Sequence, residues 1–276
     1  MGKHEGKVAV ISGGARGQGR AHAIKLASEG ADIVVFDICE QLPTVDVPMA
    51  TLADLEETAR LVRETGRRVI ALRGDVRDSD SLAHVRDTAL AEFGQIDIVV
   101  ANAGIVSLGS AVSMSDAMWD EMIAVNLSGV FKTVRACLPP MIDSGRGGVA
   151  ILTASTASFR AYDSHVHYTT AKHGVIGLMR SLAYELVSHN IRVNAVAPAA
   201  VATPLVQNEV MYNLFTGGRE DATFDDVRAA FTGLNLMKEP WVQAEDVANA
   251  VSWLASDEAR YITGVALPID LGLLIK

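Results

Sequence analysis

Short apolar runs alternate with longer helical patterns along the whole chain, and this alternation constrains the fold more than any other feature. The runs are continuous stretches of Val, Ile and Ala, which are typical of parallel strands buried on both faces. Strand–helix repetition predicts right-handed crossovers and therefore an α/β fold with a doubly wound parallel seven-stranded sheet and helices on both faces. The expected strands are 7–12, 31–37, 68–73, 96–101, 148–153, 191–197 and 264–269. The expected helices are 17–29, 51–65, 78–93, 115–138, 165–189 and 244–256.

Two segments interrupt this rhythm. Residues 38–50 contain two prolines and lengthen the connection after the second strand, and residues 204–240 separate the sixth and seventh strands. A length of 276 residues suggests two domains by itself, at ~150 residues per domain. Since no linker or repeat divides the pattern, we expect one domain over 1–276, with these two insertions. The second insertion is expected to form short helices and loops.

Composition excludes several classes of protein. Hydrophobic residues make up 49% and charged residues 21% of the chain, which excludes a disordered polymer. No apolar stretch is long enough for a membrane span, and a net charge of −9 disfavours nucleic acid and anionic membranes as partners. With no visible export signal and only Cys39 and Cys137, we expect a cytoplasmic protein with reduced thiols. The histidines lack metal-ligand spacing, so no metal site is expected.

A glycine-rich turn follows the first expected strand. The segment Ser12–Arg20 carries Gly13, Gly17 and Gly19 and leads directly into an apolar helix. Without side chains the backbone can approach a pyrophosphate, and the free N–H groups and dipole of the helix favour its negative charge. A bare flexible turn is the alternative, but the strand–turn–helix context favours a dinucleotide site.

Asp37 ends the second strand, 18 residues beyond Gly19. A carboxylate there can accept hydrogen bonds from both hydroxyls of the adenosine ribose and would repel a 2′-phosphate, so it favours NAD over NADP. Arg16 argues the other way, because a cation in the turn could meet that phosphate. We give Asp37 more weight because it would face the phosphate directly; capping of the loop is its alternative role.

A tyrosine and a lysine share one face of the sixth expected helix. Tyr168 and Lys172 stand four residues apart, and Ser155 lies 13 residues before Tyr168, at the end of the fifth strand. A phenol beside an ammonium group suits proton exchange with an alcohol, and Ser155 can hold the alcohol oxygen. Lowering a phenol pKa from ~10 to ~7 requires about 4 kcal/mol, which a nearby Lys⁺ and an oxidised nicotinamide could supply.

These motifs together resemble the short-chain dehydrogenase/reductase family over essentially the whole chain. The resemblance implies a Rossmann-type fold, a tetramer and further site residues. Asn126 would be the fourth catalytic residue and support a proton relay, with Tyr168 as general acid/base, Ser155 orienting the substrate, and Lys172 lowering the pKa of Tyr168 and binding the nicotinamide ribose. The implied cofactor contacts come from the glycine turn with Arg16 and Gln18, from Asp75 and Val76, from Asn102, Ala103 and Gly104, and from Pro198, Val201 and Thr203.

A narrower resemblance links Gly14–Arg20, Phe36–Cys39 and the 38–50 insertion to the mycofactocin-associated, carveol dehydrogenase-like subgroup. It implies tightly held NAD, alicyclic or terpenoid alcohols and a mycofactocin-type redox partner. Because the 38–50 insertion directly follows Asp37, we expect it to lie over the adenosine end of the cofactor and slow its release.

The expected activity is the interconversion of a secondary alcohol and its ketone. Residues 204–240 would form the substrate loop, with apolar surface from Met211, Leu214, Phe215, Leu234, Leu236, Met237 and Trp241. Sparse basic residues there favour a small apolar alcohol or ketone over a carrier-bound acyl chain. The alternatives are a 3-oxoacyl-thioester reductase and, from another class, a non-catalytic NAD-binding sensor, against which the complete set of four catalytic residues argues.

Overall fold

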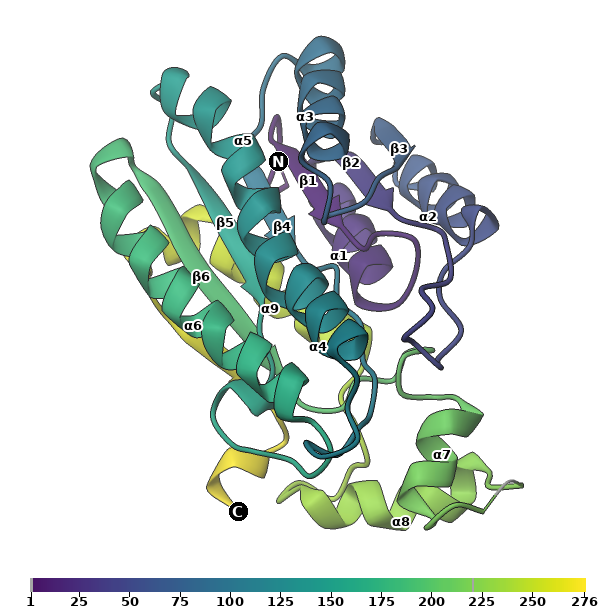
Figure 1. Ribbon diagram of the computed structural model, residues 1–276. Helices are drawn as coiled ribbons and strands as arrows, with labels where there is room; N and C mark the ends of the chain where they lie inside the picture. Colours follow the sequence, from purple (N-terminus) through teal and green to yellow (C-terminus); the bar gives the residue numbers. More distant parts are fainter. Residues whose placement is uncertain (1, 220) are drawn as a thin grey trace.

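A computed structural model describes residues 2–219 and 221–276 of the chain. Its centre is one all-parallel sheet in the order β3-β2-β1-β4-β5-β6-β7 (Figure 1). The order reverses beside β1, so the carboxyl ends of β1 and β4 flank a crevice in which doubly wound proteins bind ligands. The predicted fold class is therefore confirmed. The strands are β1 Val8–Ser12, β2 Asp32–Asp37, β3 Val69–Arg73, β4 Ile98–Ala101, β5 Gly148–Thr153, β6 Ile191–Pro198 and β7 Ala266–Ile269.

The strands are apolar throughout because both faces of the sheet are covered. Val10 and Val34 face one hydrophobic core, whereas their neighbours Ile11 and Ile33 face the other. Helices α3, α5 and α6 cover the first face, and α1, α2 and α9 cover the opposite one (Figure 1). The bounds are α1 Gly17–Ser28, α2 Leu52–Glu64, α3 Ser79–Phe93, α5 Val130–Asp143, α6 Val166–Leu186 and α9 Ala244–Ala255.

The segment expected as one helix over 115–138 is longer and less regular. It forms α4 Asp116–Ile123, a π-helical turn Ala124–Gly129, and then α5, which continues through Pro139 and Pro140 to Asp143. Prolines remove two backbone donors, but burial of Val134, Cys137 and Met141 on the core side keeps the helix together. Tertiary packing thus keeps the segment helical although the two prolines locally favour the end of the helix.

The second insertion forms α7 Glu209–Phe215 and α8 Phe224–Leu234, as predicted. These helices stand beside the body of the molecule, at the carboxyl end of the sheet (Figure 1). A separate aromatic cluster holds them, in which the Phe231 ring lies 4.1 Å from that of Phe215 and 5.6 Å from that of Trp241. Within the described residues, no helix is long and apolar enough to cross a membrane.

Candidate active site

The glycine turn after β1 requires its glycines for steric reasons. Gly13 and Gly17 have positive φ values of 65° and 56°, a conformation that other residues adopt only with strain. A Cβ on Gly13 would lie 2.7 Å from the Ala103 Cα, and a Cβ on Gly19 would lie 2.0 Å from the Gly13 carbonyl oxygen. The turn therefore brings bare backbone against the loop after β4 and starts α1 with free N–H groups.

Asp37 lies beside this turn, as predicted. Its carboxylate accepts hydrogen bonds from the backbone N–H groups of Ala15 at 3.2 Å and Cys39 at 3.3 Å. Burial raises the pKa of Asp37, while these N–H donors and the nearby Arg16 guanidinium act in the opposite direction. Arg16 itself donates to the Pro48 carbonyl oxygen. The 38–50 insertion thus holds the Arg16 guanidinium through one hydrogen bond.

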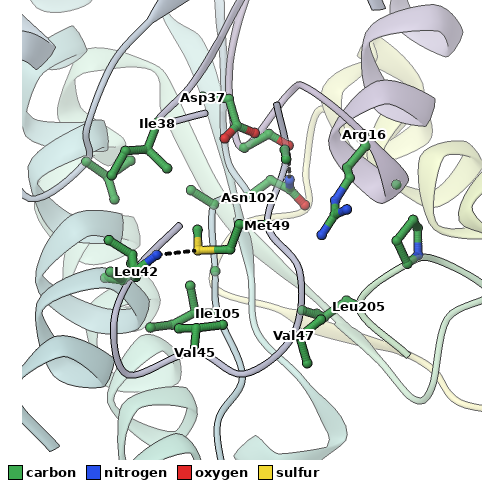
Figure 2. Close-up of a pocket in the computed structure, with 18 of the residues that line it drawn as sticks. Arg16, Asp37, Ile38, Leu42, Val45, Val47, Met49, Asn102, Ile105 and Leu205 are labelled. Carbon is green, nitrogen blue, oxygen red and sulfur yellow. Dashed lines mark hydrogen bonds between the residues drawn. The ribbon is translucent and has the colours of Figure 1, made fainter. Parts of the chain in front are cut away.

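That insertion forms one wall of a cavity of about 150 Å³ beside Asp37 (Figure 2). Leu42, Val45 and Val47 line the cavity and are buried. The Gln41 side chain shapes the loop from within, because it donates to the Val45 carbonyl oxygen at 2.6 Å and accepts from the Met49 N–H at 3.0 Å. The insertion is therefore a folded cover rather than a loose connection.

A polar network joins this cover to the body of the protein. Thr44 donates a hydrogen bond to Glu121 on α4. Glu121 pairs with Arg77 at 2.7 Å, and Arg77 pairs with Asp75 at 2.7 Å. No sequence pattern predicts this network, because Thr44 and Glu121 are distant in the chain from each other and from the Asp75–Arg77 pair. Asp75 lines the cavity as predicted, with its carboxylate held by Arg77.

The loop after β4 is anchored at both ends. The Ser12 hydroxyl oxygen accepts hydrogen bonds from the N–H groups of Asn102 and Ala103, both at 3.0 Å. Fully buried Asn126 uses its carboxamide to bind both backbone groups of Ile105, at 2.8 and 2.9 Å. The π-helical turn thus places Asn126 as a positioning residue for this loop, and a relay role for it stays a prediction.

Ser155, Tyr168 and Lys172 lie together at the carboxyl end of β5. The Ser155 oxygen accepts from the Ala157 N–H at 3.1 Å, which leaves its own proton free to donate. The buried Lys172 ammonium donates to the Thr153 carbonyl oxygen at 2.7 Å and lies 5.8 Å from the centre of the Tyr168 ring. The three residue types expected to act together are therefore neighbours in space.

Burial dominates the acid–base properties of this group. It raises the pKa of Tyr168, an effect that Ser155 opposes, and it lowers the pKa of Lys172 from 10.5 to about 8. The expected lowering of the Tyr168 pKa by Lys172 is thus not seen in the chain alone. With a pKa of about 8, Lys172 still carries its charge at pH 7. That charge and the charge of a bound nicotinamide would together have to outweigh the effect of burial on Tyr168.

A second cavity of about 320 Å³ opens beside Tyr168. Its lining is largely apolar and includes Met211, Phe215 and Leu234 from the second insertion, as predicted. Leu236 and Met237 are exposed instead, Trp241 is buried in the aromatic cluster, and the side chain of Leu214 lies outside the described part of the chain. Sequence reasoning missed several polar lining residues, which are Arg160, Tyr162 and Asn235.

The two cavities share a seam, and its residues fit a dinucleotide. Gln18, Asn102, Gly104, Ile105, Thr203 and Leu205 line both cavities. The Gln18 Oε1 atom is buried there without a hydrogen-bond partner among the described residues, so a bound group can supply one. Together with the glycine cradle and Asp37, this suits an elongated ligand that runs from the insertion to Tyr168.

Most predicted cofactor contacts lie along this path. The first cavity is lined by Gly13, Arg16, Gly17, Asp37, Asp75, Val76 and Ala103, and the second by Tyr168, Lys172, Pro198 and Val201. Thr203 packs against the glycine turn, because a Cβ added to Gly17 would lie 3.2 Å from the methyl group of Thr203. Gly19 acts through close backbone packing rather than by lining a cavity. No group of three or more potential metal-ligating side chains occurs in residues 2–219 and 221–276.

Comparison with known proteins gives the class. A family model described as "Enoyl-(Acyl carrier protein) reductase" matches residues 13–274. A protein of Mycolicibacterium smegmatis called a putative short-chain type dehydrogenase/reductase is 48% identical over all of this chain and 99% of its own length. The chain therefore belongs to the short-chain dehydrogenase/reductase family.

Within that family the chain is similar to carveol dehydrogenases. The (-)-trans-carveol dehydrogenase of Rhodococcus erythropolis is 45% identical over the full length of both proteins. The crystal structure of carveol dehydrogenase from Mycobacterium avium in complex with NAD has 46% identity, full coverage of both chains and a TM-score of 0.98. A short-chain dehydrogenase from Mycobacterium paratuberculosis bound to NAD has 38% identity, full coverage of both chains and a TM-score of 0.90.

Proposed function

We propose that this protein is an NAD-dependent oxidoreductase that interconverts an alicyclic secondary alcohol and its ketone. The observation that carries the proposal is the position of Tyr168. It lies beside Ser155 and Lys172 where the apolar second cavity adjoins the seam with the first. A substrate in the second cavity would thus meet the proton-transfer group and the end of the cofactor together.

Tyr168 acts as the general acid/base in this scheme. Ser155 donates a hydrogen bond to the substrate oxygen. Ionised Tyr168 accepts the hydroxyl proton of the alcohol as the alcohol becomes a ketone. In the reverse direction the neutral phenol donates that proton. The bound cofactor supplies the hydride chemistry. Lys172 orients the cofactor ribose from its position beside Gly104, where an added Cβ would lie 3.8 Å from Nζ.

The choice of NAD rests on Asp37. Its carboxylate lies in the first cavity next to the glycine turn, where it would accept ribose hydroxyls and repel a 2′-phosphate. Arg16 would be the opposing group, but its guanidinium is bonded to Pro48. The two related structures determined with NAD support the same choice.

The substrate class rests on the size and lining of the second cavity. A cavity of about 320 Å³ with mostly apolar walls suits a compact hydrophobic ring with one reactive oxygen. Carveol, the substrate in the name of the Rhodococcus relative, is an alcohol of this kind. The second candidate, a 3-oxoacyl-thioester reductase, draws support from the description of the matching family model.

We further propose that NAD stays bound between turnovers. The insertion covers the first cavity and is attached to the body through Arg16–Pro48, Thr44–Glu121 and Arg73–Glu40. Cofactor that does not leave must be reoxidised in place, which requires an external electron acceptor such as a mycofactocin-type redox partner. A sensor that binds NAD without turnover would have no need for the Ser155, Tyr168 and Lys172 arrangement.

The decisive experiment replaces Tyr168 by phenylalanine. Tyr168→Phe should lower turnover of (-)-trans-carveol at least about 100-fold, because general acid–base catalysis contributes ~10²–10⁴-fold, while NAD binding is retained. Tyr184→Phe is the matched control, since Tyr184 lies on the same helix and is 88% exposed. Unchanged turnover in Tyr168→Phe would refute the mechanism. Reduction of a 3-oxoacyl thioester with no activity on cyclic alcohols would support the second candidate.

A further inference from the structure

A buried polar pair joins the loop after β4 to the first turn of α6. The Ser107 hydroxyl and the His167 Nε2 atom lie 2.9 Å apart. His167 is fully buried and Ser107 nearly so, and the two residues are 60 positions apart in the chain. His167 directly precedes Tyr168, so the pair ends at the group that the proposed function makes catalytic.

The same two segments are bonded a second time nearby. The Gly109 N–H donates to the Ser164 carbonyl oxygen at 3.0 Å, and Gly109 forms a parallel bridge with His165. On its other side the loop is held by Asn126, which binds Ile105. Residues 105–109 are thus fixed between the π-helical turn and the start of α6.

This fixed loop forms part of the walls of both cavities. Gly104 and Ile105 line both cavities, and Val106 lines the second one, next to Tyr168. A displacement of the loop relative to α6 would therefore change the distance between the phenol and anything bound against these walls. Errors of ~1 Å in such a distance can cost about 100-fold in rate.

Packing alone does not account for a histidine at position 167. Its Nδ1 atom is buried without a hydrogen-bond partner among the described residues, which costs about 1–3 kcal/mol. Burial and the neighbouring His165 lower the pKa of His167, in keeping with a neutral ring. An apolar pair of the same size would fill the space without that cost, since replacing both partners of a buried hydrogen bond can be nearly neutral.

We propose that Ser107 and His167 form a positioning pair that sets Tyr168 against the substrate-side wall of the active site. The inference rests on the proposed role of Tyr168 as the acid/base. The Ser107–His167 hydrogen bond fixes the loop that carries Ser107 against the helical turn that carries His167 and Tyr168. Their role is to keep the catalytic turn in register with the cavity, without contact with the substrate.

The test separates position from stability. Ser107→Ala and His167→Leu should each lower kcat for (-)-trans-carveol about 10- to 100-fold, with bound NAD retained. The double variant should be no slower than the worse single variant, because both remove one interaction. Its thermal unfolding should lie close to that of the wild type. His167→Gln, whose Nε2 can reach Ser107, should recover part of kcat, and His173→Ala, on an exposed position of the same helix, should change nothing.

A second readout needs no substrate. The difference in tyrosinate absorbance between a protein and its Tyr168→Phe counterpart reports the titration of Tyr168. Because burial raises the pKa of Tyr168, loosening of the first turn should shift this titration down towards ~10 in the pair variants. An unaltered titration together with wild-type kcat in the folded double variant would overturn the inference.

The outcomes also separate this inference from the proposed function. If Tyr168→Phe is inactive but the pair variants turn over normally, the positioning role is wrong and the function stands. If Tyr168→Phe is active, the proposed function fails first. If the pair variants lose stability and their folded fraction keeps wild-type kcat and titration, Ser107 and His167 are merely structural, and the inference is again overturned.

Discussion

Lys172 shows how a single buried charge can reduce stability in favour of function. Its ammonium is almost inaccessible and donates to the Thr153 carbonyl oxygen, and burial lowers its pKa to about 8. The unfolded chain therefore binds more protons than the folded one between pH ~8 and ~10.5, so stability from this group rises with pH across that window. Below it, the buried charge costs about 3 kcal/mol.

Lys172→Met should therefore raise the melting temperature at pH 7, because it removes the cost of the buried charge. Loss of the hydrogen bond to Thr153 destabilises the folded state by about 1 kcal/mol. The free energy of unfolding should therefore rise by about 2 kcal/mol in total. The gain should shrink towards pH 10, and turnover should be lost. Thermal unfolding at several pH values measures this, with Lys238→Met at an exposed position as the control. A lower melting temperature at pH 7 would contradict it.

Asp37 should decide between the two nicotinamide cofactors. Asp37→Asn keeps the shape but removes the charge, so NAD loses a charge-assisted bond and a 2′-phosphate is no longer repelled. We expect the ratio of NAD to NADP affinity to fall about 10- to 100-fold. Equilibrium binding of both cofactors measures it, with exposed Glu56→Gln as the control. A ratio equal to that of the wild type would assign Asp37 to the loop alone.

At the scale of elements, the 38–50 insertion depends on contacts outside itself. Its apolar residues Leu42, Val45 and Val47 pack over the first cavity. Its polar anchors lie elsewhere, on Arg16 before α1, Arg73 of β3 and Glu121 of α4. A proline-containing loop has no helix or strand pattern from which such a closed position could be read. Its place directly after Asp37 is the only sequence feature that predicted a position over the adenosine end.

Thr44→Val should loosen this cover, because it removes the hydroxyl that binds Glu121 and preserves the size of the side chain. A hydrogen bond to a charged group contributes about 1.5–3 kcal/mol, so bound NAD should exchange with labelled NAD at least ~10-fold faster. Glu40→Gln is the matched control, since its ion pair with Arg73 is exposed and contributes little. Equal exchange rates in the wild type and Thr44→Val would show that the insertion does not retain the cofactor.

At the scale of the whole molecule, large apolar side chains are exposed on α4, on α5 and beside β7. Trp119 on α4 and Phe131 on α5 are each 38% exposed, and Val265 beside the edge strand β7 is 43% exposed. In the described part of the chain, β7 pairs only with β6. These surfaces suit contacts between copies, in keeping with the tetramer that the family implies.

The protein should therefore behave in solution as a particle of about four times the 29.3 kDa chain mass. Light scattering after size exclusion measures this mass directly. Phe131→Glu should lower it, because a charge would be buried at the contact between copies, whereas Val112→Glu, on a fully exposed side chain, should not. A wild-type mass of one chain would refute the assembly.

Much of this molecule is determined by local pattern. Continuous apolar runs such as Val8–Ser12 require a sheet buried on both faces, so the strands, their parallel direction and one domain follow from the sequence. Gly13, Asp37, Ser155, Tyr168 and Lys172 could be proposed as site residues because each lies at or just after the end of a strand or repeats at helical spacing. The sheet gathers the ends of its strands at one edge. The prediction of one helix over 115–138 was wrong in detail, because the π-helical turn and the continuation through two prolines depend on packing.

Tertiary structure alone decided how these groups are held. Ser107 meets His167, Thr44 meets Glu121, and Asn126 meets Ile105, across 21 to 77 positions of the chain. The direction of the Tyr168 and Lys172 pKa shifts also follows from burial. Local sequence fixes which backbone conformations are favourable, but desolvation and long-range hydrogen bonds exist only once the chain has packed. The chemistry could thus be predicted from residue types, and its positioning only from the fold.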